Sequence, residues 1–259
     1  MDNLRKYGRA PFTIAIVHGG PGGAGEVAPV AQELSKMQGI LEPLQTALTI
    51  EDQLHELKDV IQKRGTPPMT LIGHSWGAWL SFIFAARNPS LVKKLILVSS
   101  GPFEASYATN IMKTRLNRLS IEDQAKLQSL LNTLNDSVSK NKDATFTQLG
   151  KYIARADSYD PLPHQAAQHE GNYAIYKAVD AEAKELRRSG KLLTFGKQIQ
   201  CPVIAIHGDY DPHPYEGVQK PLSGVLKSFR FILLKNCGHT PWNERDVHEE
   251  FYRLLTKEL

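Results

Sequence analysis

MTLIGHSWGAWL, residues 69–80, joins a short apolar run to a longer one through a serine that has a glycine two residues to either side. The run Met69–Ile72 predicts a strand, and Trp76–Arg87, which is apolar on nearly every side, predicts a helix buried against a sheet. A direct turn from strand to helix leaves no space for side chains at the two flanking positions, so glycine suits both. Ser75 is then held in a strained conformation with its hydroxyl exposed above the sheet. The alternative, a serine in an ordinary turn, is disfavoured by the strand before it and the helix after it.

Short apolar runs rich in β-branched residues alternate with segments of helical period along much of the chain. This alternation predicts βαβ units and a mostly parallel sheet flanked by helices, which is the α/β class. The predicted strands are Phe12–Val17, Gly39–Gln45, Met69–Ile72, Lys94–Val98, Pro202–Ile206 and Phe229–Leu234. The predicted helices that pack on this sheet are Glu51–Lys63, Trp76–Arg87 and Val247–Leu255.

The stretch from Pro102 to about Gly196 is helical in period but contains no convincing strand. It interrupts the alternation between the strand that ends at Val98 and the strand that begins at Pro202. A chain of 259 residues can bury one large core that carries an inserted subdomain. We therefore expect a core of residues 1–101 and 197–259, and a helical insertion of residues 102–196.

Glycines crowd residues 18–23, HGGPGG, directly after the first predicted strand. Acyl transfer builds negative charge on an oxygen, and backbone N–H groups stabilise this charge where no side chain blocks their approach. The expected donors of such an oxyanion hole are the amide of Trp76, next after Ser75, and an amide at or near Gly20. A phosphate-binding loop is one alternative, but the segment matches neither G-x-G-x-x-G nor G-x-x-x-x-G-K-[ST]. A plain flexible loop is the other.

Two aspartates lie in residues 207–212, HGDYDP, which follow the strand Pro202–Ile206. Open α/β sheets keep their sites at this carboxyl end of the strands. A buried carboxylate there can hold an imidazole in one tautomer and stabilise its cation. We prefer Asp211 because the loop needs a few residues to turn the carboxylate toward the imidazole, whereas Asp209 suits the turn itself. The alternative is that both aspartates serve only the turn.

The imidazole is expected in residues 237–242, CGHTPW, which follow the last predicted strand. His239 lies after the strand that neighbours the strand of Asp211, and the glycine before it gives the loop its bend. Two other histidines, His18 and His74, lie inside the motifs above, but we expect their rings to point away from the serine hydroxyl. A surface histidine is the alternative for His239. The chain order Ser75, Asp211, His239 is then that of nucleophile, acid and base.

Composition and charge exclude several classes of protein. The net charge of +4 is spread along the chain, without the basic stripe of a nucleic-acid-binding surface, so no nucleic-acid partner is expected. No secretory signal is evident, and the apolar runs are far shorter than the roughly 20 residues of a membrane-spanning helix. We expect a cytoplasmic protein with no membrane partner, in which Cys201 and Cys237 stay reduced. The expected chemistry needs no metal and no organic cofactor, and the sequence does not predict the oligomeric state.

Through these motifs the chain resembles the alpha/beta-hydrolase superfamily over nearly its whole length. The pairing of His18–Gly22 with Ser75–Gly77 resembles the proline iminopeptidases in particular. The resemblance implies an alpha/beta-hydrolase fold in which residues 102–196 form a helical cap over the site. Members of that group cut an N-terminal proline from short peptides, and a cap of this kind must supply acidic groups for the free amine. The positional candidates for that role are Glu104, Asp157, Asp160 and Glu170.

The chain departs from this family's pattern in two places. Its first predicted strand begins near Phe12, which leaves no room for the antiparallel hairpin that commonly opens the fold. We therefore expect a shortened N-terminal edge, with about two strands fewer than usual. His74 also stands where those peptidases more often carry glycine.

The expected reaction is acyl transfer from a small-molecule or short-peptide substrate. His239 takes the proton of Ser75, which attacks an ester or amide carbonyl, and water later releases the acyl group from the enzyme. Asp211 stays ionised throughout. A small-molecule carboxylesterase is the alternative to an aminopeptidase. A non-catalytic binding protein on the same fold is the alternative of another class.

Overall fold

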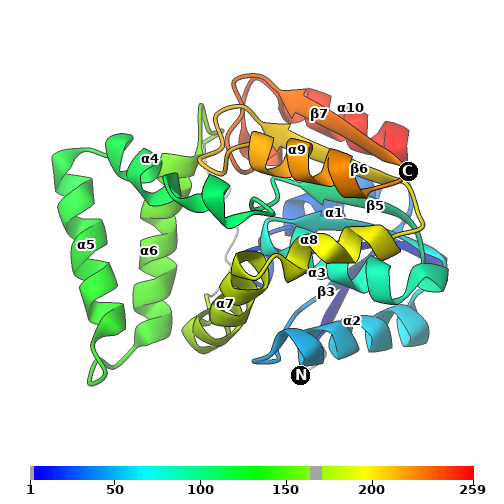
Figure 1. Cartoon of the computed structure of the whole chain (residues 1–259), viewed down its shortest axis with the longest axis horizontal. Coiled ribbons are helices and arrows are strands. Elements are labelled where there is room, and N and C mark those ends of the chain that lie inside the picture. The colour runs from blue at the N-terminus through cyan, green and yellow to red at the C-terminus, as the bar shows by residue number, and fades with distance from the viewer. Residues whose placement is uncertain (1–2, 164–170) are drawn as a thin grey trace.

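A seven-stranded sheet runs through the centre of the computed structural model, which describes residues 3–163 and 171–259 (Figure 1). The strands lie in the order β1-β3-β2-β4-β5-β6-β7, with β1 antiparallel to β3 and all other neighbouring pairs parallel. This arrangement confirms the predicted α/β class with a mostly parallel sheet. The strands are β1 (Leu4–Tyr7), β2 (Phe12–Val17), β3 (Gly39–Pro43), β4 (Met69–His74), β5 (Val92–Val98), β6 (Val203–Gly208) and β7 (Phe229–Leu234).

Helices flank both faces of the sheet, and a further group extends away from it (Figure 1). None of the helices in the described ranges is both long enough and apolar enough to cross a membrane. The α-helices are α1 (Ala28–Leu34), α2 (Ile50–Arg64), α3 (Trp76–Arg87), α4 (Ile111–Asn117), α5 (Ile121–Asn135), α6 (Lys142–Asp157), α7 (Tyr173–Arg188), α8 (Lys191–Thr194), α9 (Glu216–Val225) and α10 (His248–Glu258). Short 3-10 helices are η1 (Pro89–Leu91), η2 (Ala105–Ala108), η3 (Phe195–Gln198) and η4 (Pro241–Asn243).

Successive side chains of the central strands enter two different hydrophobic cores, one on each face of the sheet. In β5, Leu95 and Leu97 join the core beneath α2, α3 and α9, whereas Ile96 and Val98 join the core beneath α1 and α10. This is the two-residue period of a strand whose faces are both covered. It explains why the central strands appear in the sequence as continuous apolar runs rather than as alternating ones.

The chain between β5 and β6 forms helices α4 to α8 in its described part, apart from an isolated β-bridge between Pro161 and Glu244. These helices pack in two places. α5 and α6 share a small core of their own, which includes Leu127 and Leu149, and they stand apart from the sheet in Figure 1. Ile175 of α7 instead packs into the larger core on the sheet.

The sequence did not predict the edge strand β1. No residue of β1 is fully buried, and its central Arg5 and Lys6 are exposed, so the segment shows no apolar run. The strand forms because Leu4 to Tyr7 pair in register with Pro43 to Ile40 of β3. β1 does not pair with β2, so the N-terminal edge has one antiparallel strand and no hairpin.

The turn between β4 and α3 lies directly against the end of β2. A Cβ atom on Gly77 would collide with the carbonyl oxygens of Val17 and His18, and one on Gly73 would collide with the backbone of Gly77. The first turn of α3 can therefore approach the backbone of β2 only where both side chains are missing. This close approach fixes the position of Ser75, which lies between the two glycines.

We expect Gly77→Ala to lower the free energy of unfolding by about 1–3 kcal/mol or more, because the backbone must shift to admit the methyl group. Gly150→Ala is the matched control, since a Cβ on this helical glycine of α6 meets no atom within 4 Å. That substitution should stabilise the protein by about 0.5–1 kcal/mol. Urea denaturation measures both changes, and equal stabilities of the two variants would contradict the packing described for Gly77.

Candidate active site

Ser75 occupies the turn between β4 and α3 in a strained backbone conformation. Its φ is +52° and its ψ is −113°, values that few residues other than glycine adopt. Its backbone N–H donates to the carbonyl of Val98 at the end of β5, at 3.0 Å, which holds the turn over the carboxyl edge of the sheet. The side chain is only partly buried. This geometry is that of the predicted serine turn, in which local strain exposes the hydroxyl.

Asp211 lies in the loop after β6 with its side chain fully buried, and its Oδ2 accepts a 2.7 Å hydrogen bond from Nδ1 of His239. Burial alone would raise the pKa of Asp211. The neighbouring imidazoles of His239, His213 and His207, together with a hydrogen bond from His213, hold the pKa well below its usual range instead. Asp211 is therefore an ionised acceptor, and the Nδ1 of His239 carries the proton between them.

The backbone and the ring of His239 are both fixed by neighbours. Its N–H donates to the carbonyl of Asp157 at 2.8 Å, and its carbonyl accepts from Nε2 of His74 at 3.0 Å. The rings of His74 and His213 lie 4.8 and 4.7 Å from the His239 ring, centroid to centroid. Burial alone would lower the pKa of His239, but the charge of Asp211 and the hydrogen bond between them raise it.

The structure brings His239 together with Asp211, but it does not join His239 to Ser75. Within the described residues, no hydrogen bond links the Ser75 hydroxyl to His239. The turn that carries Ser75 and the loop that carries His239 are nevertheless in contact through His74, which precedes Ser75 in the chain and packs against the His239 ring. Hydrogen bonds between a nucleophile and its base are often long before a substrate binds.

The glycine loop after β2 lies beside Ser75. Gly19 is buried so tightly that a Cβ there would stand 3.0 Å from Cβ of Ser75. Gly20 is exposed, has a φ of +39°, and a Cβ on it would meet nothing within 4 Å. Trp76 is the first residue of α3, where a backbone N–H has no partner within the helix. Of the two amides predicted as oxyanion donors, that of Trp76 directly follows Ser75 in the chain. That of Gly20 follows Gly19, which lies beside Ser75 in space.

The two histidines inside these motifs have other partners. His18 is fully buried; its Nδ1 donates to the carbonyl of Gly19 at 3.0 Å and its Nε2 accepts from the N–H of Gln45 at 3.2 Å. His74 donates to the carbonyl of His239, and its Nδ1 lies 3.1 Å from Oε2 of Glu26. The hydrogen bonds of His18 therefore stabilise the glycine loop, and those of His74 stabilise the loop that carries His239.

Sequence reasoning missed Glu244, which ties the His239 loop to the helical insertion. Its buried carboxylate accepts backbone N–H groups from Gly238 at 3.0 Å, Tyr159 at 2.9 Å and Asp160 at 2.8 Å. A hydrogen bond from the N–H of Leu162 to the carbonyl of Asn243, at 2.8 Å, continues this contact. We call residues 157–162 and 238–245 together the clasp. A glutamate five residues after a loop histidine is the only signal in the sequence that could have indicated it.

Two of the four acidic residues predicted to bind a substrate amine, Asp157 and Asp160, form ion pairs with arginines. Asp157 is buried and forms a bidentate ion pair with Arg115, at 2.7 and 2.6 Å. Asp160 pairs with Arg245 at 3.1 Å, near the surface. Glu104 is exposed just before η2, and Glu170 lies outside the described residues. Asp157, the candidate nearest His239, is therefore not available to bind an amine.

Asp211, His213 and His239 place possible metal-ligand atoms within 4.8 Å of one another. Both Nδ1 atoms in this group, however, donate hydrogen bonds to the carboxylate, at 2.8 and 2.7 Å. A metal ion would have to replace both protons and separate these pairs, because tetrahedral coordination at about 2.0–2.2 Å spaces its ligands more widely. We therefore treat the group as hydrogen-bonded imidazoles and assign no metal ligand to it.

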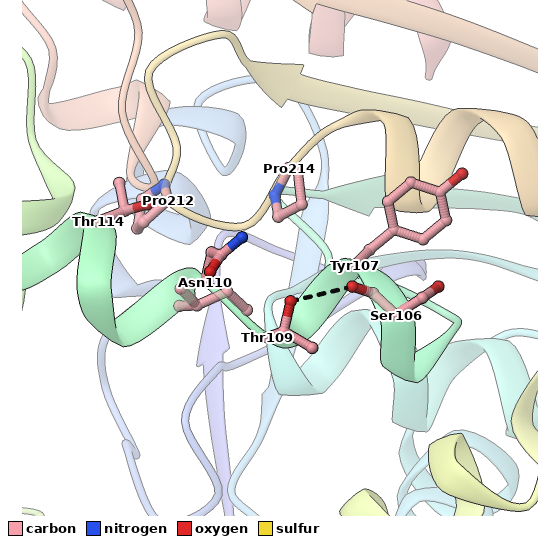
Figure 2. Close-up of a pocket in the computed structure, with 8 residues that line it drawn as sticks. Ser106, Tyr107, Thr109, Asn110, Thr114, Pro212 and Pro214 are labelled. Carbon is pink, nitrogen blue, oxygen red and sulfur yellow. Dashed lines mark hydrogen bonds between the residues drawn. The ribbon is translucent and has the colours of Figure 1, made fainter.

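A cavity of about 250 Å³ lies on the outer side of the Asp211 loop. Figure 2 shows its wall, in which Pro212 and Pro214 face residues of η2 and α4. The lining residues are Ser106, Tyr107, Thr109, Asn110, Ile111, Thr114, Pro212 and Pro214. Neither Ser75 nor His239 lines this cavity, so it is separate from the reacting groups.

Comparison with known proteins agrees with the observed fold. The family model described as the alpha/beta hydrolase fold matches residues 13–242. A proline iminopeptidase of Lactobacillus delbrueckii subsp. lactis is 32% identical, over 92% of this chain and 87% of the relative. A pimeloyl-[acyl-carrier protein] methyl ester esterase of Nitrosomonas europaea is 27% identical, over 74% of this chain and 72% of the relative. The crystal structure of VinJ superposes with a TM-score of 0.68 at 18% identity, covering 98% of this chain and 93% of VinJ.

Removal of the Glu244 carboxylate should destabilise the protein strongly. We expect Glu244→Ala to lower the free energy of unfolding by about 2 kcal/mol or more, because it leaves three backbone N–H groups, including that of the buried Gly238, without an acceptor. Asp246→Ala, an exposed carboxylate in the same loop, is the control and should change stability by less than about 0.5 kcal/mol. Equal unfolding midpoints in urea for the two variants would refute the role given to the clasp.

Proposed function

The chain belongs to the alpha/beta hydrolase family, within its proline iminopeptidase-like group, and from this we propose that it is a serine hydrolase that cleaves a carboxylic ester or amide through an acyl-enzyme. The observation that carries the proposal is the 2.7 Å hydrogen bond between His239 and the buried carboxylate of Asp211, beside the strained turn of Ser75. The esterase and iminopeptidase names of the relatives are consistent with it.

In the proposed reaction, Ser75 is the nucleophile and His239 the general base. Nδ1 of His239 is committed to Asp211, so Nε2 is the atom that takes the serine proton as the oxygen attacks the carbonyl carbon. The amides of Gly20 and Trp76 stabilise the oxyanion that forms. The leaving alcohol or amine takes the proton from His239, and a water molecule activated by the same Nε2 then releases the acid. These steps use side chains, backbone amides and water alone.

We further propose that residues 102–196 are a cap inserted into a core of residues 1–101 and 197–259. Two contacts support this arrangement. On one side the clasp joins the insertion to the His239 loop. On the other, the N–H of Asn172 donates to the carbonyl of Gly22 in the glycine loop, at 3.1 Å. The insertion therefore contacts both loops that the proposed reaction uses.

The ion pairs of Asp157 and Asp160 favour an ester substrate over a peptide with a free amino terminus. An amine-binding subsite needs a carboxylate that is not already paired, and Asp157 and Asp160 are each paired with an arginine. Glu26, beside the glycine loop, accepts the N–H of Gly19 at 2.8 Å. The aminopeptidase alternative is supported by the names of the relatives but by none of these contacts.

A cytoplasmic location is also part of the proposal. Cys201 and Cys237 are both free, which suits a reducing compartment. Burial raises the pKa of Cys201 to about 11, so this thiol has little reactive thiolate at neutral pH.

Ser75→Ala tests the nucleophile. We expect a fluorophosphonate probe to label the wild-type protein at Ser75 and not the variant, and hydrolysis of p-nitrophenyl esters to fall by about 10⁴-fold or more. Circular dichroism and the urea midpoint should stay close to wild type, since the change removes one partly exposed hydroxyl. Failure of the wild-type protein to react with the probe would favour a non-catalytic binding protein, and undiminished activity of the variant would refute the assignment.

A pair of amide substrates tests the preference for a free amine. A site built to bind the amino group of prolyl p-nitroanilide should reject its N-acetyl derivative by about 10⁴-fold in kcat/KM. We expect no such discrimination, and we expect p-nitrophenyl esters to be the faster substrates. Strong selection for the free amine would show that an acidic subsite exists and that the aminopeptidase alternative is correct.

A further inference from the structure

The carboxylate of Asp211 is shared by two imidazoles rather than held by one. Its Oδ2 accepts from Nδ1 of His239, and its Oδ1 accepts from Nδ1 of His213 at 2.8 Å and from the backbone N–H of His213 at 2.9 Å. Nε2 of His207 lies 3.4 Å from Oδ2. Each oxygen of this buried carboxylate therefore accepts a hydrogen bond, and His213 supplies two of the three donors.

His213 is held in this position from several sides. Prolines precede and follow it, which restricts the backbone on both sides. Its carbonyl accepts a 2.8 Å hydrogen bond from Nε2 of the fully buried His207. Its ring lies against the ring of His239 at an interplanar angle of 33°. The side chain is only 15% exposed, so the ring has little freedom to turn away from Asp211.

Burial favours the neutral form of His213. Burial lowers the pKa of His213 to about 4, against the opposing effect of Asp211; the nearby His239 and the Arg115 guanidinium lower it further. Burial also lowers the pKa of His207. The pKa of His239 is raised instead. Burial and the charge of Arg115 lower it, but the charge of Asp211, the hydrogen bond with Asp211 and the charge of Asp157 together outweigh them. The cluster thus accepts its first proton on His239, while His213 remains a neutral N–H donor.

We propose that His213 is a positioning residue of this site, whose neutral imidazole donates a hydrogen bond to Asp211 and thereby sets the orientation of the carboxylate and the basicity of His239. The catalytic consequence of this inference rests on the proposed function, whereas its electrostatic part does not.

The expected direction follows from how a carboxylate distributes its charge. A donor on Oδ1 withdraws charge that would otherwise stabilise the His239 cation through Oδ2. Loss of that donor should strengthen the attraction between Asp211 and protonated His239, and it should therefore raise the pKa of His239. Since the base must be unprotonated to act, the low-pH limb of kcat/KM should then move to higher pH.

Two substitutions separate hydrogen bonding from packing. His213→Phe keeps an aromatic ring against His239 but removes the donor. His213→Asn removes the ring but can place an amide N–H at the position of Nδ1. If His213 acts through its hydrogen bond, the Asn variant stays near wild type and the Phe variant does not. If it only fills space, the order is reversed.

The test is an NMR titration of the histidine side chains in the full chain, together with pH profiles of kcat/KM on a p-nitrophenyl ester. We expect His213→Phe to raise the pKa of His239 by roughly half a unit to one unit and to move the low-pH limb by the same amount. His213→Asn should leave both near wild type. An unshifted pKa in the Phe variant, or equal shifts in both variants, would overturn the proposal.

The wild-type protein provides a test that does not depend on the folding of any variant. Its His213 nitrogens should report the neutral Nδ1–H tautomer throughout the titration of His239. A neutral Nε2–H tautomer at His213, which cannot donate to Asp211, would also overturn the proposal. Because this measurement requires no turnover, its outcome is separate from that of fluorophosphonate labelling, which tests the proposed hydrolase function alone.

Discussion

The buried negative charge of Asp211 is the constraint on which the arrangement of the site depends. A carboxylate removed from water is tolerated only where donors surround it, and here those donors are two imidazole N–H groups and one backbone N–H. They come from the loop after β6 and from the loop after β7. Parallel pairing of β6 with β7 brings the two loops to one edge of the sheet. The same charge keeps the proton on Nδ1 of His239 and leaves Nε2 as the basic atom.

The helical insertion is connected to this edge through backbone as well as side chains. His239 donates its own N–H to Asp157, and that residue uses its carboxylate to hold Arg115. Glu244 then joins the end of α6 to the bend at Gly238. Asp157 and Glu244 are thus part of the framework that holds the His239 loop.

Sequence patterns predicted the central elements well and the peripheral ones poorly, for physical reasons. α3 and β2 have the predicted bounds because strongly apolar segments with clear flanking breaks leave little choice of boundary. β1 was missed because an edge strand with exposed Arg5 and Lys6 has no apolar period, and α9 was missed because Pro221 lies inside it. Asp211 and His239 could be predicted, since a loop at the carboxyl end of a strand is a local property. The partner Glu244 depends on contacts between distant segments, which no local pattern encodes. His213 lies only two residues from Asp211, but the sequence pattern does not show which way its ring points.

The clasp limits how the helical insertion can be exchanged between related proteins. A segment whose backbone is bonded to the N–H of His239, to the carbonyl of Gly22 and to the carboxylate of Glu244 is not an independent module. Transplanting a different insertion onto this sheet would also require compatible residues at those three places on the recipient. The sequence of this insertion and the anchoring of His239 are therefore inherited together, and divergence in one restricts divergence in the other.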